Sequence, residues 1–189
     1  DIVNYARPQS NIDKNSPCPS GGILVYVKSS IFKHTSIVYS QCDHIVALKV
    51  SSPERSTEDD IYIIHAYLPP ENTTFECKTC DNNYIEMLEN CLARFASKGR
   101  TVICGDLNAR VGQLQDYPES FEGSNGNFPS IESNTEYFTD QRKTCDLVTN
   151  KRGRQLIDMC KHTSFQIMNG RYINTLNTGK YTRANASLT

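Results

Sequence analysis

Four short segments rich in β-branched and aromatic residues precede the first helical pattern of the chain, and this order constrains the fold most. They are GGILVYVK (21–28), SIVYS (36–40), HIVALKV (44–50) and IYIIHAYLPP (61–70). Each is typical of a strand, and the two prolines that close the last one cannot continue a strand ladder. Because the connections between the segments are short and polar, we expect antiparallel neighbours.

The period of the apolar residues changes to a helical one between residues 81 and 99, with Asp81 as the expected N-cap and Gly99 as the expected end. The strand RTVICGD (100–106) follows without alternation, which predicts burial on both faces. Strands followed by a helix packed between strands predict a single mixed-sheet α/β domain over residues 1–189. The apolar face of the expected helix comprises Tyr84, Leu88, Cys91, Leu92 and Phe95.

The rest of the chain shows weaker patterns. We expect a second helix at about 150–162 and strands at 164–170 and 179–183. The first twenty residues are polar and are interpreted as loop. Residues 113–145 are rich in Gly, Ser, Asn and Pro, and an irregular stretch of this length in a compact domain is usually functional or disordered.

The charges are distributed unevenly along the 189 residues, although the formal net charge is only −1. Residues 142–183 carry nine Lys/Arg against two Asp, whereas residues 1–141 carry eleven Lys/Arg against nineteen Asp/Glu. Such a basic segment is typical of a surface that meets a polyanion, and equally of a solvated helix face. No apolar run approaches the roughly 20 residues that span a bilayer, so we expect no membrane partner.

The eight cysteines do not predict a disulfide framework, because a chain of this length does not need one. Cys91, Cys104 and Cys160 lie in apolar patterns and are interpreted as small core residues. The pair Cys77-x-x-Cys80 lacks a second pair at zinc-finger spacing. We therefore expect a reducing, intracellular compartment.

The stretch TVICGDLNARVG (101–112) places a carboxylate and an amide where a strand ends. Residues two apart in an extended chain point the same way, so Asp106 and Asn108 would project together, with Leu107 turned toward the core and Gly105 allowing a bend or a close ligand. A carboxylate that takes a proton from water, next to an amide that holds the water or a phosphoryl oxygen, suits phosphate-ester hydrolysis. The alternative is that both side chains only close a turn.

With this motif, the chain resembles the endonuclease/exonuclease/phosphatase family, which has the DNase-I-like fold. The Gly-Asp-Leu-Asn motif, GGILVYVK and IIHAYLPP match family blocks in order. NKRGRQLIDMCKHTSFQIMNGR followed by GKYTR is similar to the endonuclease domains of LINE-type (non-LTR) retrotransposons. The resemblance covers roughly residues 20–185 and implies a four-layer α/β sandwich of two mixed, largely antiparallel sheets flanked by helices.

The resemblance also implies roles for matching residues. Tyr67 matches the Tyr that contacts the scissile phosphate, Asp106 the Asp that orients or deprotonates the attacking water, and Asn108 the Asn that holds water and phosphate. The family uses Mg²⁺, or Mn²⁺, to stabilise charge on the leaving oxygen. The implied reaction nicks DNA to leave a 3′-hydroxyl, in a nuclear protein that also carries a reverse transcriptase domain. On chemical grounds we add phosphate-binding candidates at Arg110, Lys151, Arg152 and Arg154. For Arg110, a plain surface position is an equal alternative.

Two departures from the family pattern limit these expectations. We find no counterpart of the family's Asn and metal-binding Glu ahead of the Gly-Gly strand, and no Ser-Asp-His. We therefore expect a truncated domain that is inactive alone, with the metal ligand upstream of residue 1. Two alternatives stay open: another phosphoesterase of the same family, or a degenerate copy that binds nucleic acid or protein without catalysis.

Overall fold

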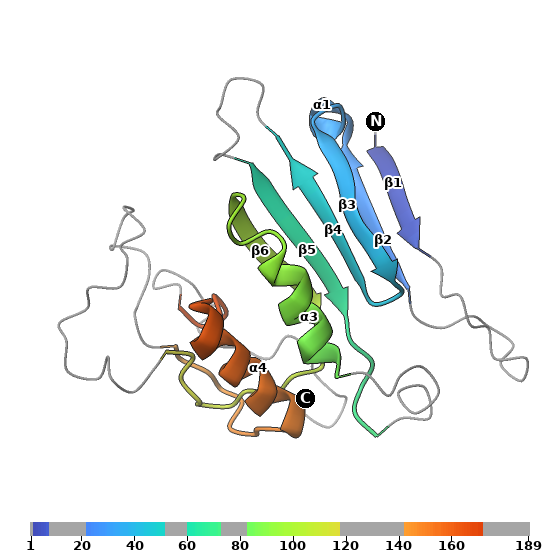
Figure 1. Cartoon of the computed structure of the whole chain (residues 1–189). Helices are drawn as coiled ribbons and strands as arrows, with labels where there is room; N and C mark the ends of the chain where they lie inside the picture. Colours follow the sequence, from blue (N-terminus) through green and yellow to red (C-terminus); the bar gives the residue numbers. More distant parts are fainter. Residues whose placement is uncertain (1, 8–21, 52–59, 73–82, 118–141, 172–189) are drawn as a thin grey trace, which may run out of the picture. The chain divides into compact units, whose positions relative to one another are not determined.

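The computed structural model describes residues 2–7, 22–51, 60–72, 83–117 and 142–171, which form a mixed α/β structure (Figure 1). The chain divides into two compact units, residues 1–108 and 109–189, and each is described by itself. The mixed α/β class is the one expected from the order of strands and helices. The expectation of a single domain stays a prediction.

The first unit is built on a four-stranded sheet of order β3-β4-β5-β6. Its strands are β3 (Thr35–Cys42), β4 (Ile45–Val50), β5 (Ile61–Tyr67) and β6 (Arg100–Asp106). β3, β4 and β5 pair antiparallel, as their short connections predicted, and β6 pairs parallel with β5. β5 and β6 are parallel because the helix between them returns the chain to the end of the sheet at which β5 begins.

Strand β4, and not β6, is the strand buried on both faces. Ile45, Val46, Ala47 and Leu48 are all buried, because β4 has a neighbouring strand on each side and packed residues above and below it. β6 lies at the edge of the sheet among the described strands, and half of the Val102 surface is exposed. The predicted double burial of β6 is therefore wrong: its continuous apolar run reflects neither a central position nor two covered faces.

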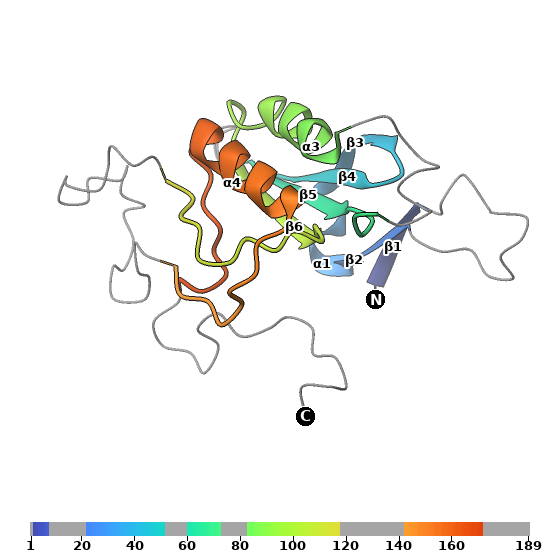
Figure 2. The same cartoon turned by 90° about the horizontal axis from the view of Figure 1, so that it is seen from below.

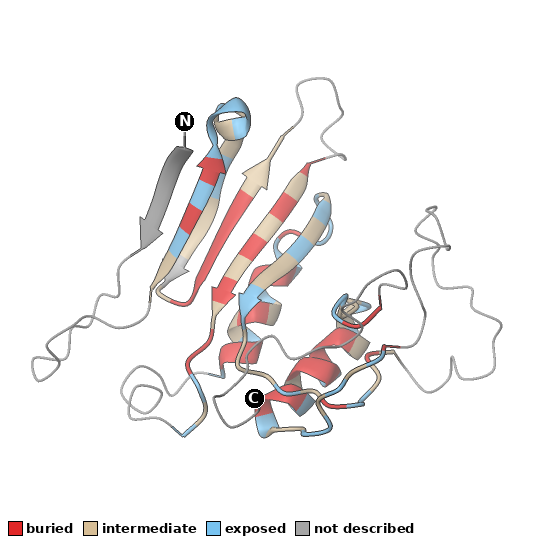
Figure 3. Ribbon diagram, turned by 180° about the vertical axis from the view of Figure 1, so that it is seen from behind, coloured by how far each residue is buried: buried red, intermediate tan, exposed pale blue. Residues whose placement is uncertain are grey.

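Helix α3 (Tyr84–Ala93) covers one face of this sheet (Figure 2). The ring of Phe95, just beyond the helix, stacks on Tyr62 of β5 at 4.9 Å between centroids. This face receives the alternate buried residues of β5, which Figure 3 shows as a banded strand. The expected apolar face of the helix is confirmed, because its members Tyr84, Leu88, Cys91, Leu92 and Phe95 are all buried.

The ends of α3 differ from the expected ones. Asn83 is the N-cap and its side chain accepts from Ile85 N at 3.2 Å, while Asp81 lies outside the described residues. The helix ends at Ala93 rather than near Gly99. Gly99 serves the sheet instead, because a Cβ there would collide with the Asp60 carbonyl at the point where Arg100 N donates to Asp60 O.

A second sheet of two strands packs on the other face of β4. β1 (Ile2–Arg7) pairs antiparallel with β2 (Ile23–Lys28), and the short helix α1 (Ser29–Phe32) follows β2. The expected pairing of the strand at 21–28 with the strand at 36–40 is therefore wrong, because β2 and β3 belong to different sheets. Val25 and Val27 of β2 form one apolar cluster with Val46 and Leu48 of β4. The interpretation of the first twenty residues as loop is wrong for β1: its sequence IVNYAR contains the strand formers Ile, Val and Tyr, and it pairs with β2.

The second unit contains helix α4 (Lys151–Thr163), close to the expected 150–162. Asn150 caps its start by accepting from Gly153 N at 2.8 Å, and Ser164 closes its end in a left-handed conformation, with φ of 58°. Cys160 is buried in α4, as expected. No strand forms at 164–170, because the left-handed Ser164 turns the chain away and these residues find no ladder partner among the described ones. The strand expected at 179–183 lies outside the described residues, and so does most of 113–145.

Within the described residues, no helix is both long and apolar enough to cross a membrane.

Candidate active site

Tyr67 and Asp106 lie side by side at the carboxyl ends of two neighbouring parallel strands. The register of β5 and β6 pairs Tyr67 with Asp106. The backbone stays joined beyond this pair, because Leu68 N donates to Asp106 O at 2.9 Å. In α/β sheets, side chains that handle ligands gather at this edge. The structure thus brings together two predicted site residues that are far apart in the sequence.

Asn108 joins these two residues through a turn and not through extended chain. β6 ends at Asp106, and Asn108 has a positive φ of 47°. Asn108 N donates to Asp106 Oδ1 at 2.9 Å, and Asn108 Nδ2 donates to Leu68 O at 2.8 Å. The expected strand-like alternation beyond Asp106 is therefore wrong, although all three predicted catalytic residues do lie at one sheet edge.

The exposure of the three side chains differs. Asp106 is exposed, whereas Tyr67 and Asn108 are partly buried. An exposed carboxylate can accept a proton from water. The same carboxylate also closes a turn through Oδ1, so the structure contains the turn that competed with the catalytic interpretation.

Gly105 fits the role expected for it, a close backbone approach. Its φ is 130°, and a Cβ on this residue would collide with the carbonyl of its register partner Ala66. Only glycine combines this conformation with this approach. Gly105 therefore fixes the spacing of β5 and β6 immediately before Tyr67 and Asp106.

A thiol–imidazole pair lies two residues before Tyr67 and Asp106, on the same face of the two strands. Cys104 Sγ is 3.3 Å from His65 Nδ1, and the two residues are register partners. Burial lowers the pKa of His65 and raises the pKa of the Cys104 thiol, so both groups are neutral near pH 7. The contact agrees with the structural interpretation of His65. Sequence alone did not pair the two residues, since their contact depends on the strand register.

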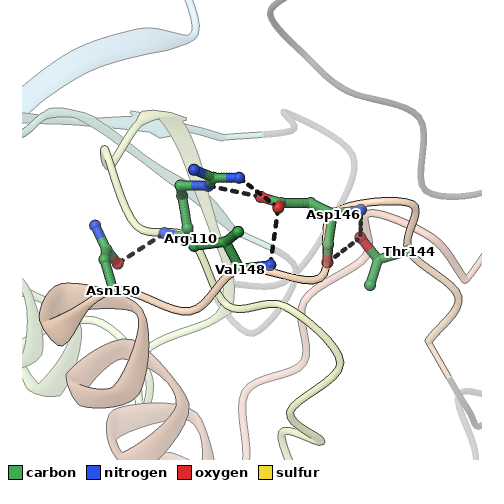
Figure 4. Close-up of polar contacts among 5 residues, drawn as sticks. All are labelled: Arg110, Thr144, Asp146, Val148 and Asn150. Atoms are coloured by element: carbon green, nitrogen blue, oxygen red, sulfur yellow. Dashed lines mark hydrogen bonds and ion pairs between the residues drawn. The ribbon is translucent and has the colours of Figure 1, made fainter.

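In the second unit, Arg110 is held by a carboxylate (Figure 4). Its Nε donates to Asp146 Oδ2 at 2.9 Å and its Nη2 donates to Asp146 Oδ1 at 2.6 Å. Its backbone N also donates to Asn150 Oδ1 at 2.9 Å. The hydrogen bonds from Arg110 lower the pKa of Asp146. Arg110 was predicted to meet phosphate, and in this structure its guanidinium binds Asp146.

The other three basic candidates lie in the first turn of α4. Lys151 and Arg154 are exposed, whereas Arg152 is only 3% exposed. Exposed lysine and arginine side chains can neutralise phosphates. A DNA contact stays a prediction for all three, and the burial of Arg152 weighs against it for that residue.

The second unit contains a buried ion pair that was not predicted from the sequence. Arg171 Nη2 forms an ion pair with Asp116 Oδ1, and Ile167 N donates to Asp116 Oδ2 at 2.6 Å. Arg142 is also buried and donates to the carbonyls of Gly112 and Leu114 at 2.7 and 2.8 Å. Asp116 stands alone in an irregular stretch of sequence, so no local pattern marks it as a buried partner.

The described residues contain no group of three or more His, Cys, Asp or Glu side chains arranged to hold a metal ion. Mg²⁺ is commonly bound by one or two carboxylates together with water and substrate phosphates. The exposed carboxylate of Asp106 fits one such ligand position.

No protein-family model, no curated protein and no solved structure matches the chain.

Proposed function

We propose that Tyr67, Asp106 and Asn108 form the substrate-facing part of a phosphodiester-hydrolysing site, and that the substrate is DNA. The observation that carries this proposal is the parallel register that sets Tyr67 beside Asp106, with Asn108 bound to Leu68 O. Three residues matched by the family resemblance thus meet at the sheet edge where such sites are usual.

The proposed roles follow from the chemistry of each group. The Asp106 carboxylate accepts a proton from the attacking water, for which its exposed position is suitable. The Asn108 amide, oriented by Leu68 O, holds the water and a phosphoryl oxygen without adding negative charge. The Tyr67 hydroxyl donates to a non-bridging oxygen of the scissile phosphate. When bound, Mg²⁺ or Mn²⁺ would stabilise negative charge on the leaving oxygen.

The wider proposal is a DNase-I-like, LINE-type endonuclease domain that nicks DNA in the nucleus and is linked to a reverse transcriptase. In the first unit, two sheets packed through Val25, Val27, Val46 and Leu48, with α3 on the outer face, support the four-layer arrangement. The exposed Lys151 and Arg154 support a polyanionic partner. Hydrolysis of another phosphate ester by the same site is the enzyme alternative.

A non-catalytic nucleic-acid or protein-binding copy is the alternative from another class. The turn between Asp106 Oδ1 and Asn108 N favours it, because this turn gives Asp106 a structural use that needs no substrate. The two functions differ in one property of Asp106: catalysis needs its negative charge, whereas the turn needs only an acceptor oxygen.

Hydrolysis of bis(4-nitrophenyl) phosphate tests the catalytic function. This diester has a stable leaving group, so it needs little of the leaving-oxygen stabilisation that the metal would supply. Asp106→Asn keeps the acceptor oxygen of the turn and removes the charge, whereas Asp106→Ala removes both. The expected inactivity of the chain concerns DNA; on this activated diester we expect slow hydrolysis by the wild-type chain and a loss on the order of 100-fold in both variants. Tyr67→Phe should also slow the reaction, with Tyr26→Phe, at an exposed position of β2, as the matched control.

Wild-type hydrolysis no faster than that of Asp106→Asn would contradict a catalytic role and favour the binding copy. A parallel assay on supercoiled DNA with Mg²⁺ tests the chain on its proposed substrate. We expect no nicking by the 189-residue chain alone, because these residues contain no counterpart of the family's Glu and Ser-Asp-His. Nicking that is lost in Asp106→Asn would overturn that expectation and strengthen the enzyme assignment.

A further inference from the structure

Two adjacent apolar side chains are exposed in the second unit, on the segment that leads into α4. Leu147 is 71% exposed and Val148 is 49% exposed. Single exposed apolar residues are ordinary on protein surfaces. Leu147 and Val148 differ from such single residues because they are adjacent and because hydrogen bonds hold their backbone in a position where both side chains are exposed.

Hydrogen bonds fix this backbone before and after the pair. Asp146 N donates to Thr144 Oγ1 at 3.1 Å, and Val148 N donates to Asp146 Oδ1 at 3.0 Å (Figure 4). The bridge between Thr149 and Val111 follows immediately. The Asp146 carboxylate in turn accepts hydrogen bonds from Nε and Nη2 of Arg110. Collapse of the pair onto the protein would break these contacts.

The close approach of Gly112 explains why the side chains face solvent. Gly112 has a φ of 51°, and a Cβ there would lie 3.2 Å from the carbonyl oxygens of both Leu147 and Val148. The backbone carbonyls of the pair therefore lie against Gly112. Its side chains are left on the outer side of the segment.

The pair is flanked by exposed cations. Lys143 precedes it, and Lys151 and Arg154 follow it, all three exposed. The one acidic residue of this segment, Asp146, is neutralised by Arg110. Apolar side chains accompanied by lysine and arginine are the combination with which proteins insert between base steps of DNA from the minor groove. The cations hold the phosphates while the apolar groups replace part of the lost base stacking.

We propose that Leu147 and Val148 form an apolar wedge that enters double-stranded DNA between two base pairs, with Lys143, Lys151 and Arg154 on the flanking phosphates. This inference rests on the proposed DNA-directed function, and it adds a distortion of the substrate. The wedge requires bases, whereas the cations alone require only negative charge. Duplex DNA and heparin, a polyanion without bases, therefore separate the two contributions.

The test uses a DNA duplex with a 2-aminopurine base, whose fluorescence rises when it unstacks, and the double variant Leu147→Ser/Val148→Ser. We expect fluorescence to rise when the wild-type chain binds and to stay unchanged with the variant. The variant should also bind the duplex on the order of tenfold more weakly, because it cannot bury the two apolar side chains. Heparin affinity should be unchanged. Met168→Ser, at a 49% exposed apolar residue of the same unit, is the matched control and should behave as wild type.

Three results would overturn the wedge: a chain that binds neither polymer, a variant that unstacks DNA as well as wild type, or a variant that loses heparin and DNA affinity equally. Circular dichroism and Tm establish that the double variant is folded, as expected for two exposed positions. Failure of the wedge is distinguishable from failure of the proposed function. The wedge is read from duplex distortion, and the catalytic site from Asp106-dependent hydrolysis of a small ester.

Discussion

Tyr67 and Asp106 are register partners on parallel strands, so the last residue of β5 meets the last residue of β6. If β5 and β6 were antiparallel, their last residues would lie at opposite ends of the strands and could not be neighbours. The helix between the two strands is therefore a requirement of the candidate site as well as of the core. The position of this pair depends on the spacing of the two strands, which Gly105 controls.

Replacement of Gly105 should destabilise the first unit. In Gly105→Ala the new Cβ would collide with Ala66 O, and the residue would have to keep a φ of 130°. We expect a loss of about 2 kcal/mol or more in the free energy of unfolding, measured by urea denaturation. Val102→Ala, at a half-exposed position on the same strand, is the control and should cost less than about 1 kcal/mol. Equal effects of the two substitutions would contradict this account.

Local pattern was sufficient to predict most strands and both long helices, because alternation and helical spacing are properties of neighbouring residues. The sequence did not reveal sheet order. The continuous apolar run of β6 predicted burial on both faces, yet the doubly buried strand is β4, whose Val46 and Leu48 pack against β2. β1 was missed because its short IVNYAR segment, which contains Ile, Val and Tyr, begins an otherwise polar stretch of twenty residues, and its partner β2 is distant in the sequence.

For the candidate site too, the sequence predicted the local motif but not the contacts that depend on the fold. Asp106 and Asn108 were visible as a motif, but the left-handed φ of Asn108 and its bond to Leu68 O depend on the fold of a distant segment. The contact between His65 and Cys104 also required the strand register. Arg110 was predicted to face phosphate because its partner Asp146 could not be identified from spacing.

The buried and the exposed ion pairs of the second unit should differ in their contribution to stability. Arg171→Met leaves Asp116 buried without its cation, and we expect a cost of about 3 kcal/mol or more. Arg110→Met breaks the more exposed pair with Asp146 and should cost about 1 kcal/mol or less. Both are measured by denaturant unfolding. Similar costs for the two variants would show that burial does not set the contribution of these pairs.

The pair of Arg110 and Asp146 should also make stability depend on pH at the acid end. The pKa of Asp146 is lowered in the folded chain, chiefly by the hydrogen bonds from Arg110. The stabilisation is therefore complete above the unfolded pKa of 3.8 and is lost as the pH falls through the lower folded value. We expect the difference in unfolding free energy between wild type and Asp146→Asn to shrink below pH of about 4. A difference that stays constant on acidification would contradict this linkage.

The described cysteines should differ in reactivity with a thiol reagent. Cys145 is exposed, whereas Cys91 and Cys160 are buried, and burial raises the pKa of Cys160 to about 12. Only the thiolate reacts, so iodoacetamide at pH of about 8 should label Cys145 and spare the other two until the chain unfolds. Peptide mass spectrometry assigns the labelled positions. Labelling of Cys160 at the rate of Cys145 in the folded chain would contradict the burial.

The salt dependence of DNA binding should identify which basic side chains contact phosphate. Each neutralised phosphate releases counterions, so the slope of log affinity against log salt should fall by about one in Lys151→Ala and again in Arg154→Ala. Lys33→Ala, an exposed lysine of the first unit, is the control and should leave the slope unchanged. Affinities from fluorescence anisotropy over a series of salt concentrations give the slopes. A slope that Lys151→Ala and Arg154→Ala leave unchanged would remove the first turn of α4 from the DNA-binding surface.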